Sequence, residues 1–184
     1  MTRPIGIGAI RLVKRWEGCR LEAYQDVAGV WTIGWGTTAI QGVPVKQGDK
    51  ITRKEADELL YKQVQSHAGR MLLPYDTMWE LSQHQYDALA SFHYNLGAKV
   101  LRDSDLREML IKGHYEDAVK EMKIYNGCRI LGDYVILEGL TKRREKEAKV
   151  FKRKDGRIRN FFYKGIDRTA IAGYAVYRHF KGWY

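Results

Sequence analysis

Residues 17–38 read EGCRLEAYQDVAGVWTIGWGTT. Apolar residues recur at helical spacing just before this stretch, so we expect a helix over residues 5–18 with Glu17 in its last turn. The period then changes, because residues 26–29 have the composition of a turn and residues 30–33 are strand formers. The sequence therefore predicts a helix that gives way to a small β-hairpin, with Glu17 where the helix ends.

The chain beyond this hairpin is predicted to be mainly helical. Thr52 and Ser82 each open a capping box, with Glu55 and Gln85 three residues later and an apolar face behind each. Further helices are expected over residues 104–112, 115–125 and 141–152.

We expect one α+β domain, mainly helical, over residues 1–151. Its small β region covers about residues 20–50 and its helical part about residues 52–151. Residues 152–184 form a basic, aromatic extension with nine Lys and Arg against two Asp, so +7 of the net charge of +10 lies there. Its charge and aromatic residues indicate an anionic partner, either nucleic acid, an acidic face such as the inner membrane, or bacterial envelope polymers such as lipopolysaccharide phosphates. The alternative is that the extension packs on the domain.

The composition is that of a folded chain with a real core, at 45% hydrophobic and 29% charged residues over 184 residues. No signal-peptide core and no apolar run long enough to span a membrane is found. Cys19 and Cys128 lie far apart, so we expect two reduced thiols. The five His residues show neither metal-ligand spacing nor a nucleophile–His–acid set, so no metal is expected.

Three polar residues of the opening stretch can converge on one site: Glu17 at a helix end, Asp26 in a turn and Thr32 on a strand. Cleavage of a glycosidic bond needs an acid for the leaving oxygen and a second polar group that places or activates a nucleophile. Gly34 and Gly36 would let a polymer approach the backbone closely. The structural alternatives are a surface carboxylate, a turn former and an ordinary β-former.

This stretch resembles the active-site segment of phage-type lysozymes, the muramidases of glycoside hydrolase family 24. The spacing from Glu17 to Asp26 is nine residues and that from Asp26 to Thr32 is six, as in the family pattern. Residues 81–97 and 139–145 are similar to the family's central helix and its late arginine helix. The resemblance covers about residues 5–151.

The resemblance implies a two-lobed lysozyme in which Glu17 is the general acid, Asp26 orients a water and Thr32 assists that water. The family cleaves the β-1,4 bond between N-acetylmuramic acid and N-acetylglucosamine, typically with inversion and without a cofactor. It pairs the catalytic Glu with a late-helix Arg, here Arg143 or Arg144, with Arg144 favoured. The substrate-binding candidates are Tyr24, Gly34, Trp35, Gly36 and Asn95, although Trp31 and Trp35 suit a hairpin core as well as a sugar-stacking surface.

The resemblance also implies an endolysin that waits in the host cytoplasm for a holin to open the membrane and then reaches the cell wall. Some export-capable relatives have Cys in place of Asp26 and carry an N-terminal anchor, which we do not expect in this protein. Residues 125–139 are longer than the equivalent loop in many relatives. We expect a monomer that binds peptidoglycan and no nucleic acid; the alternatives are a lytic transglycosylase and a cationic, non-enzymatic lytic protein.

Overall fold

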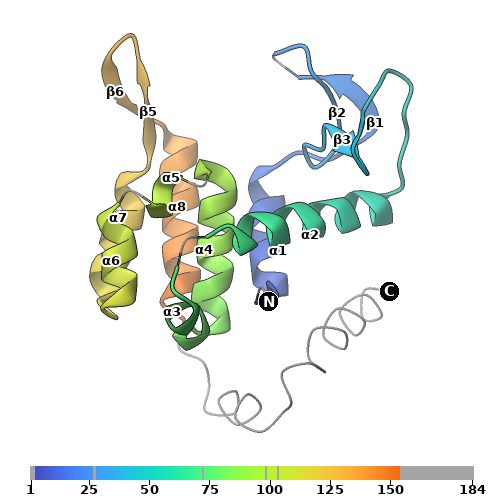
Figure 1. Ribbon diagram of the computed structural model, residues 1–184. Helices are drawn as coiled ribbons and strands as arrows, with labels where there is room; N and C mark the ends of the chain where they lie inside the picture. Colours follow the sequence, from blue (N-terminus) through green and yellow to red (C-terminus); the bar gives the residue numbers. More distant parts are fainter. Residues whose placement is uncertain (1–2, 27, 72, 98, 103, 154–184) are drawn as a thin grey trace, which may run out of the picture. The chain divides into compact units, whose positions relative to one another are not determined.

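A computed structural model describes residues 3–26, 28–71, 73–97, 99–102 and 104–153. These residues belong to one compact unit, Met1–Arg153 (Figure 1). The predictions for the basic aromatic extension lie outside the described residues from position 154 onward. No helix within the described part is both long and apolar enough to cross a bilayer.

The first part of the chain holds one helix and two small strand pairs. Helix α1 (Ile7–Trp16) leads into the antiparallel pair β1 (Arg20–Gln25) and β2 (Trp31–Gly34). A second antiparallel pair follows, β3 (Ala39–Ile40) and β4 (Val43–Pro44). The predicted helix and hairpin are therefore present at the predicted positions.

The remainder is mainly helical, which confirms the predicted α+β, mainly helical fold. The elements are α2 (Arg53–Gly69), α3 (Tyr75–Glu80), α4 (Gln83–Leu96), α5 (Lys99–Arg102), α6 (Asp105–Ile111), α7 (Tyr115–Ile124), β5 (Gly127–Ile130), β6 (Asp133–Ile136) and α8 (Glu138–Phe151). Thr52 and Ser82 form reciprocal capping boxes with Glu55 and Gln85, so both predicted helix starts are confirmed.

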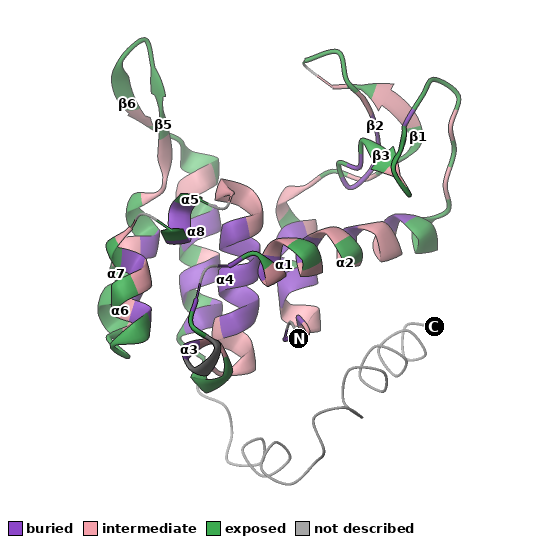
Figure 2. Ribbon diagram, viewed as in Figure 1, coloured by how far each residue is buried: buried purple, intermediate pink, exposed green. Residues whose placement is uncertain are grey.

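Helix α4 is the centre of the core. Its residues from Tyr86 to His93 are all buried, and it packs against α1, α2 and α8 (Figure 2). A helix that is buried all round must be covered by neighbours on every side, which explains why the other long helices surround it. Asp87 on this helix accepts a 2.6 Å hydrogen bond from the Gly6 amide and thereby holds the start of α1.

The sequence predicted no strands in residues 125–139, yet β5 and β6 form an antiparallel hairpin there. Leu131 and Gly132 make its turn with positive φ angles of 52° and 101°. Leu is an unusual choice at such a position, where Asn, Asp or Gly is common, so the usual hairpin signal was missing. The strands also lack a regular apolar–polar alternation, the second signal that would have revealed them.

Two histidines from neighbouring helices meet inside the core. His93 of α4 is fully buried, and its ring lies 5.9 Å from that of His67 on α2 in an edge-to-face arrangement. Burial, together with the charges of His67 and Arg70, lowers the pKa of His93 to about 4. His93 is therefore neutral in the folded protein at neutral pH.

This burial predicts a pH-dependent stability. The unfolded chain binds a proton at His93 below pH ~6.5, whereas the folded chain does so only near pH 4. As the pH is lowered from ~6.5 to ~4, the free energy of unfolding therefore falls by up to ~1.4 kcal/mol per pH unit. Above pH ~6.5 the residue contributes no pH dependence. Urea unfolding from pH 7 to pH 4 should show a shallower loss in His93→Phe than in the wild type. Equal slopes for the two, with the exposed His114→Phe as control, would contradict this assignment.

Candidate active site

Glu17 lies at the point where α1 stops. Its backbone is extended, with φ −97° and ψ 135°, and its amide still donates to the Val13 carbonyl at 3.1 Å. The chain leaves the helix here and runs into β1. The Glu17 side chain is 34% exposed, so a large substrate can reach a carboxylate whose backbone is fixed.

Arg143 of α8 holds the Glu17 carboxylate from the protein side. Its Nη1 lies 3.2 Å from Glu17 Oε1, and the Arg143 side chain is only 5% exposed. A guanidinium that is itself shielded from water interacts more strongly with a carboxylate than an exposed one does. One face of Glu17 is therefore occupied by a cation while the other stays open.

A buried carboxylate, Glu147, orients both late-helix arginines. Glu147 is fully buried, and its Oε1 lies 3.4 Å from Arg143 Nε and accepts a 2.7 Å hydrogen bond from the Ser91 hydroxyl. Its Oε2 lies 3.1 Å from Arg144 Nε, an ion pair without hydrogen-bond alignment. Burial raises the pKa of Glu147, while Arg144, Ser91 and Arg143 oppose that shift. Because Glu147 engages the Nε end of each guanidinium, the terminal nitrogens point away from it.

The preference for Arg144 as the partner of Glu17 is wrong. Arg144 is 1% exposed, donates from Nη2 to Asn95 Oδ1 at 2.6 Å and stacks its guanidinium 4.7 Å from the centroid of Phe92. Neighbouring residues on a helix point about 100° apart, so only one of the two arginines can face Glu17. The side-chain oxygen of Asn95, a residue predicted to bind substrate, thus already accepts a hydrogen bond from Arg144.

Tyr94 of α4 interacts electrostatically with Glu17. Burial raises the pKa of its phenol, the negative charge of Glu17 raises it further, and Arg143 lowers it. These effects place the phenol within the field of the Glu17–Arg143 pair. The Tyr94 ring also lies 5.1 Å from the ring of His67.

Asp26 and Thr32 meet at the backbone of Val30. Asp26 Oδ1 accepts hydrogen bonds from the amides of Ala28 and Val30, both at 2.9 Å, so the carboxylate closes its own turn. The Thr32 hydroxyl, on a residue that is 4% exposed, donates to the Val30 carbonyl at 3.1 Å. Thr32 is also the cross-strand partner of Tyr24, whose ring carries the Arg20 guanidinium at 4.4 Å. The hairpin therefore brings Tyr24, Asp26 and Thr32 together.

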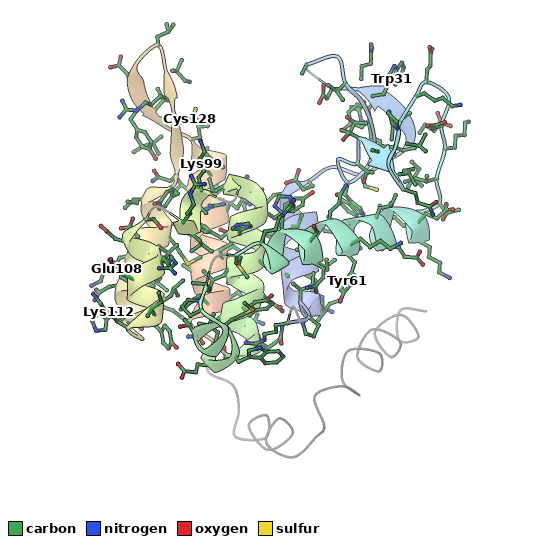
Figure 3. All side chains as sticks on the ribbon, in the orientation of Figure 1. Trp31, Tyr61, Lys99, Glu108, Lys112 and Cys128 are labelled. Carbon is green, nitrogen blue, oxygen red and sulfur yellow. The ribbon has the colours of Figure 1, made fainter. Side chains whose placement is uncertain are left out.

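Trp35 belongs to the core, so its interpretation as a sugar-stacking surface is not supported. It is 5% exposed, and its Nε1 donates to Asp57 Oδ1 at 2.8 Å. The cations of Arg53 and Lys14 lie over its ring at 4.4 and 5.2 Å from the centroid. The indole is thus near charged groups of the protein itself, whereas Trp31 on the β1–β2 hairpin remains partly exposed (Figure 3).

The two glycines predicted to bind substrate, Gly34 and Gly36, have different surroundings. Gly34 has a φ of +65°, and a Cβ there would lie 3.2 Å from Ile51 Cδ1 and 3.4 Å from Ala56 Cβ. Its role is therefore the close packing of β2 against α2. Gly36 has a φ of +101° and open space around it, so it is the glycine that a polymer could approach.

Sequence reasoning missed Glu147, Ser91 and Tyr94. A signal was present for Glu147, because it lies four residues after Arg143 and three after Arg144, the spacings at which helical side chains meet. Ser91 and Tyr94 carry no local signal, since their contacts with α8 and Glu17 join segments far apart in the sequence.

Comparison with known proteins identifies the family of this chain. The family model described as phage lysozyme matches residues 14–147, so the chain belongs to the phage lysozyme family. An endolysin of Acyrthosiphon pisum secondary endosymbiont phage 1 is 36% identical over 140 residues, which cover 76% of this chain and 92% of that relative. An endolysin of Bacillus phage B103 is 34% identical over 80% of this chain, but the match spans only 53% of that relative's length.

Solved structures agree on the fold. The endolysin from Escherichia coli O157:H7 phage FAHEc1 superposes with a TM-score of 0.70 at 32% identity, over 82% of this chain and 94% of that one. A mutant of P22 lysozyme superposes with a TM-score of 0.67 at 30% identity, over 81% and 98% of the two chains. The predicted lysozyme-like fold is confirmed, and the protein is an endolysin-type glycosidase.

Proposed function

We propose that the chain hydrolyses the β-1,4 bond between N-acetylmuramic acid and N-acetylglucosamine in peptidoglycan, with inversion at the cleaved carbon. Glu17 acts as the general acid. The observation that carries the proposal is the Glu17 carboxylate, fixed at a helix end, held on one side by Arg143 and open on the other. A positioned carboxylic acid is what departure of the leaving oxygen requires.

Arg143 has a role after the proton has left Glu17. The transfer turns the acid into a carboxylate, and the guanidinium at 3.2 Å stabilises the new negative charge. Because Glu147 and the protein interior fix Arg143, little reorganisation is needed as the charge develops.

Asp26 orients the attacking water, with help from Thr32. Two backbone amides fix Asp26 Oδ1, while Oδ2 accepts no hydrogen bond from the described residues and is available to a water. Thr32 donates its proton to Val30, so its oxygen can accept a hydrogen bond from the same water. An inverting glycosidase needs a carboxylate that activates water in this way.

We place this activity in host-cell lysis. The chain waits in the host cytoplasm, passes a holin lesion as a monomer and reaches the peptidoglycan. Residues 152–184, with their net charge of +7, hold it against anionic envelope material.

Glu17→Gln keeps the size of the side chain but removes the acid. The rate of turbidity loss of a purified peptidoglycan suspension should fall by at least about 10²-fold, the typical contribution of a general acid. Glu22→Gln, a nearby exposed carboxylate paired with Lys50, should retain the wild-type rate. Thermal unfolding of all three proteins should be similar. Lysis of cells by a folded Glu17→Gln at the wild-type rate would instead indicate a cationic, non-enzymatic lytic protein.

A lytic transglycosylase is the second candidate, and the engagement of Asp26 in its own turn favours it. Such an enzyme needs one catalytic acid and no carboxylate that orients water, so Asp26 would be structural.

The two candidates predict different products from purified sacculi. Hydrolysis gives free reducing ends of N-acetylmuramic acid, whereas a transglycosylase gives 1,6-anhydro ends, and mass spectrometry distinguishes them. We expect reducing ends from the wild type and a loss of at least about tenfold in rate for Asp26→Asn, whose amide still accepts the turn hydrogen bonds. Anhydro ends, formed equally fast by Asp26→Asn, would establish the transglycosylase.

A further inference from the structure

A cavity of about 290 Å³ lies between α2 and the β3–β4 turn, formed by residues that the proposed mechanism does not use. None of its eight lining residues is acidic. Six of them are polar or basic: Gln41, Lys62, Gln63, Ser66, His67 and Arg70. The volume is close to the lower end of that of small-ligand sites. The chemistry of the lining therefore suits an anionic group that also forms hydrogen bonds.

The two permanent cations of this cavity are available to a ligand. Lys62 and Arg70 are exposed, and neither side chain forms an ion pair or hydrogen bond with another described residue. Burial lowers the pKa of His67, and the Arg70 charge lowers it further, which places the guanidinium close to the imidazole. No ion pair or hydrogen bond with another described residue thus neutralises the positive potential here.

Two polar atoms of the lining are buried without a partner. Gln63 Nε2 donates to Thr37 Oγ1 at 3.1 Å, which fixes the amide and leaves Gln63 Oε1 without a hydrogen bond. His67 Nδ1 is in the same situation. Such atoms are destabilising until a partner pairs with them. Since Gln63 Oε1 can only accept a hydrogen bond, the ligand must supply an N–H or O–H as well as a negative charge.

Tyr94 links the cavity to Glu17. The ring of His67, which lines the cavity, lies 5.1 Å from the Tyr94 ring, and the charge of Glu17 acts on the Tyr94 phenol. A residue of the cavity and the proposed acid therefore both interact with Tyr94. Gln41, across the cavity from α2, is held at a φ of +52°, which is uncommon for a residue other than Gly, Asn or Asp and occurs more often at functional sites.

We propose that this cavity binds the peptide stem of peptidoglycan, with Lys62 and Arg70 on a stem carboxylate and Gln63 Oε1 on a stem amide N–H. The proposal rests on the proposed function, because it assigns part of the same substrate. A peptide offers both a carboxylate for the two cations and an N–H for Gln63 Oε1, whereas a neutral sugar alone lacks the negative charge. The cavity would then recognise stem-bearing glycan in preference to bare glycan.

Steady-state kinetics on two forms of the substrate test the proposal: purified sacculi with their stems, and glycan strands stripped of stems by an amidase. Lys62→Gln/Arg70→Gln should raise KM about tenfold on stem-bearing sacculi and leave kcat within about twofold, because stem binding is equal in the ground and transition states. On stripped strands both constants should stay within about twofold of the wild type. Both residues are exposed and unpaired within the described chain, so the variant should fold normally.

Lys54→Gln/Lys149→Gln is the matched control, since it removes the same charge from exposed positions on α2 and α8 that do not line the cavity. It should not change KM on either substrate at about 150 mM salt, where long-range attraction is screened. An equal rise in KM on both substrates for the cavity variant, or no rise on sacculi, would overturn the proposal.

Calorimetry with a free stem tetrapeptide separates this proposal from the proposed function. The wild type and Glu17→Gln should bind the tetrapeptide alike, and Lys62→Gln/Arg70→Gln should bind it at least about tenfold more weakly. This result, with no cleavage of peptidoglycan, would retain the cavity and reject the glycosidase. Binding of inorganic phosphate as tight as that of the tetrapeptide, or no tetrapeptide binding, would overturn the peptide assignment.

Discussion

The arrangement of the site depends on one buried carboxylate between two buried guanidiniums. Glu147 is fully enclosed and faces Arg143 through one oxygen and Arg144 through the other. Removing the carboxylate or the guanidiniums would leave the opposite charge unpaired in a low-dielectric interior, which typically lowers the free energy of unfolding by about 3–5 kcal/mol. Because each arginine is held through its Nε, Arg143 extends to Glu17 and Arg144 to Asn95. The position of the proposed acid is thus coupled to the packing of α4 against α8.

The other polar candidates come from a different region of the fold. Asp26 and Thr32 are arranged by the β1–β2 hairpin, through hydrogen bonds to the backbone of Val30. Trp35 attaches that hairpin to α2 through its hydrogen bond to Asp57 and the Arg53 cation over its ring. Gly34 does so by close contact with Ala56. An acid fixed by the helices and a water site fixed by the hairpin would serve opposite sides of the scissile bond.

Local patterns were sufficient for much of the fold. The capping boxes at Thr52 and Ser82, the helix that ends at Glu17 and the hairpin after it all follow from residues close together in sequence. The choice between Arg143 and Arg144 could not be made this way, because it depends on how α8 is rotated against α1. Burial of Trp35 likewise depends on α2, and the β5–β6 hairpin lacks the turn residues that announce one. The roles of Asp26, Thr32 and the other site residues remain predictions.

The central claim is that Glu17 is the proton donor and that Arg143 holds it. The most direct measurement compares the rates of cleavage of purified sacculi by Arg143→Ala and Arg144→Ala at a temperature at which both variants are folded. The two arginines are sequence neighbours, both buried and bound to the same Glu147, but only Arg143 contacts Glu17. The account predicts a rate for Arg143→Ala at least about tenfold below that for Arg144→Ala. Equal rates, or a greater loss for Arg144→Ala, would contradict it.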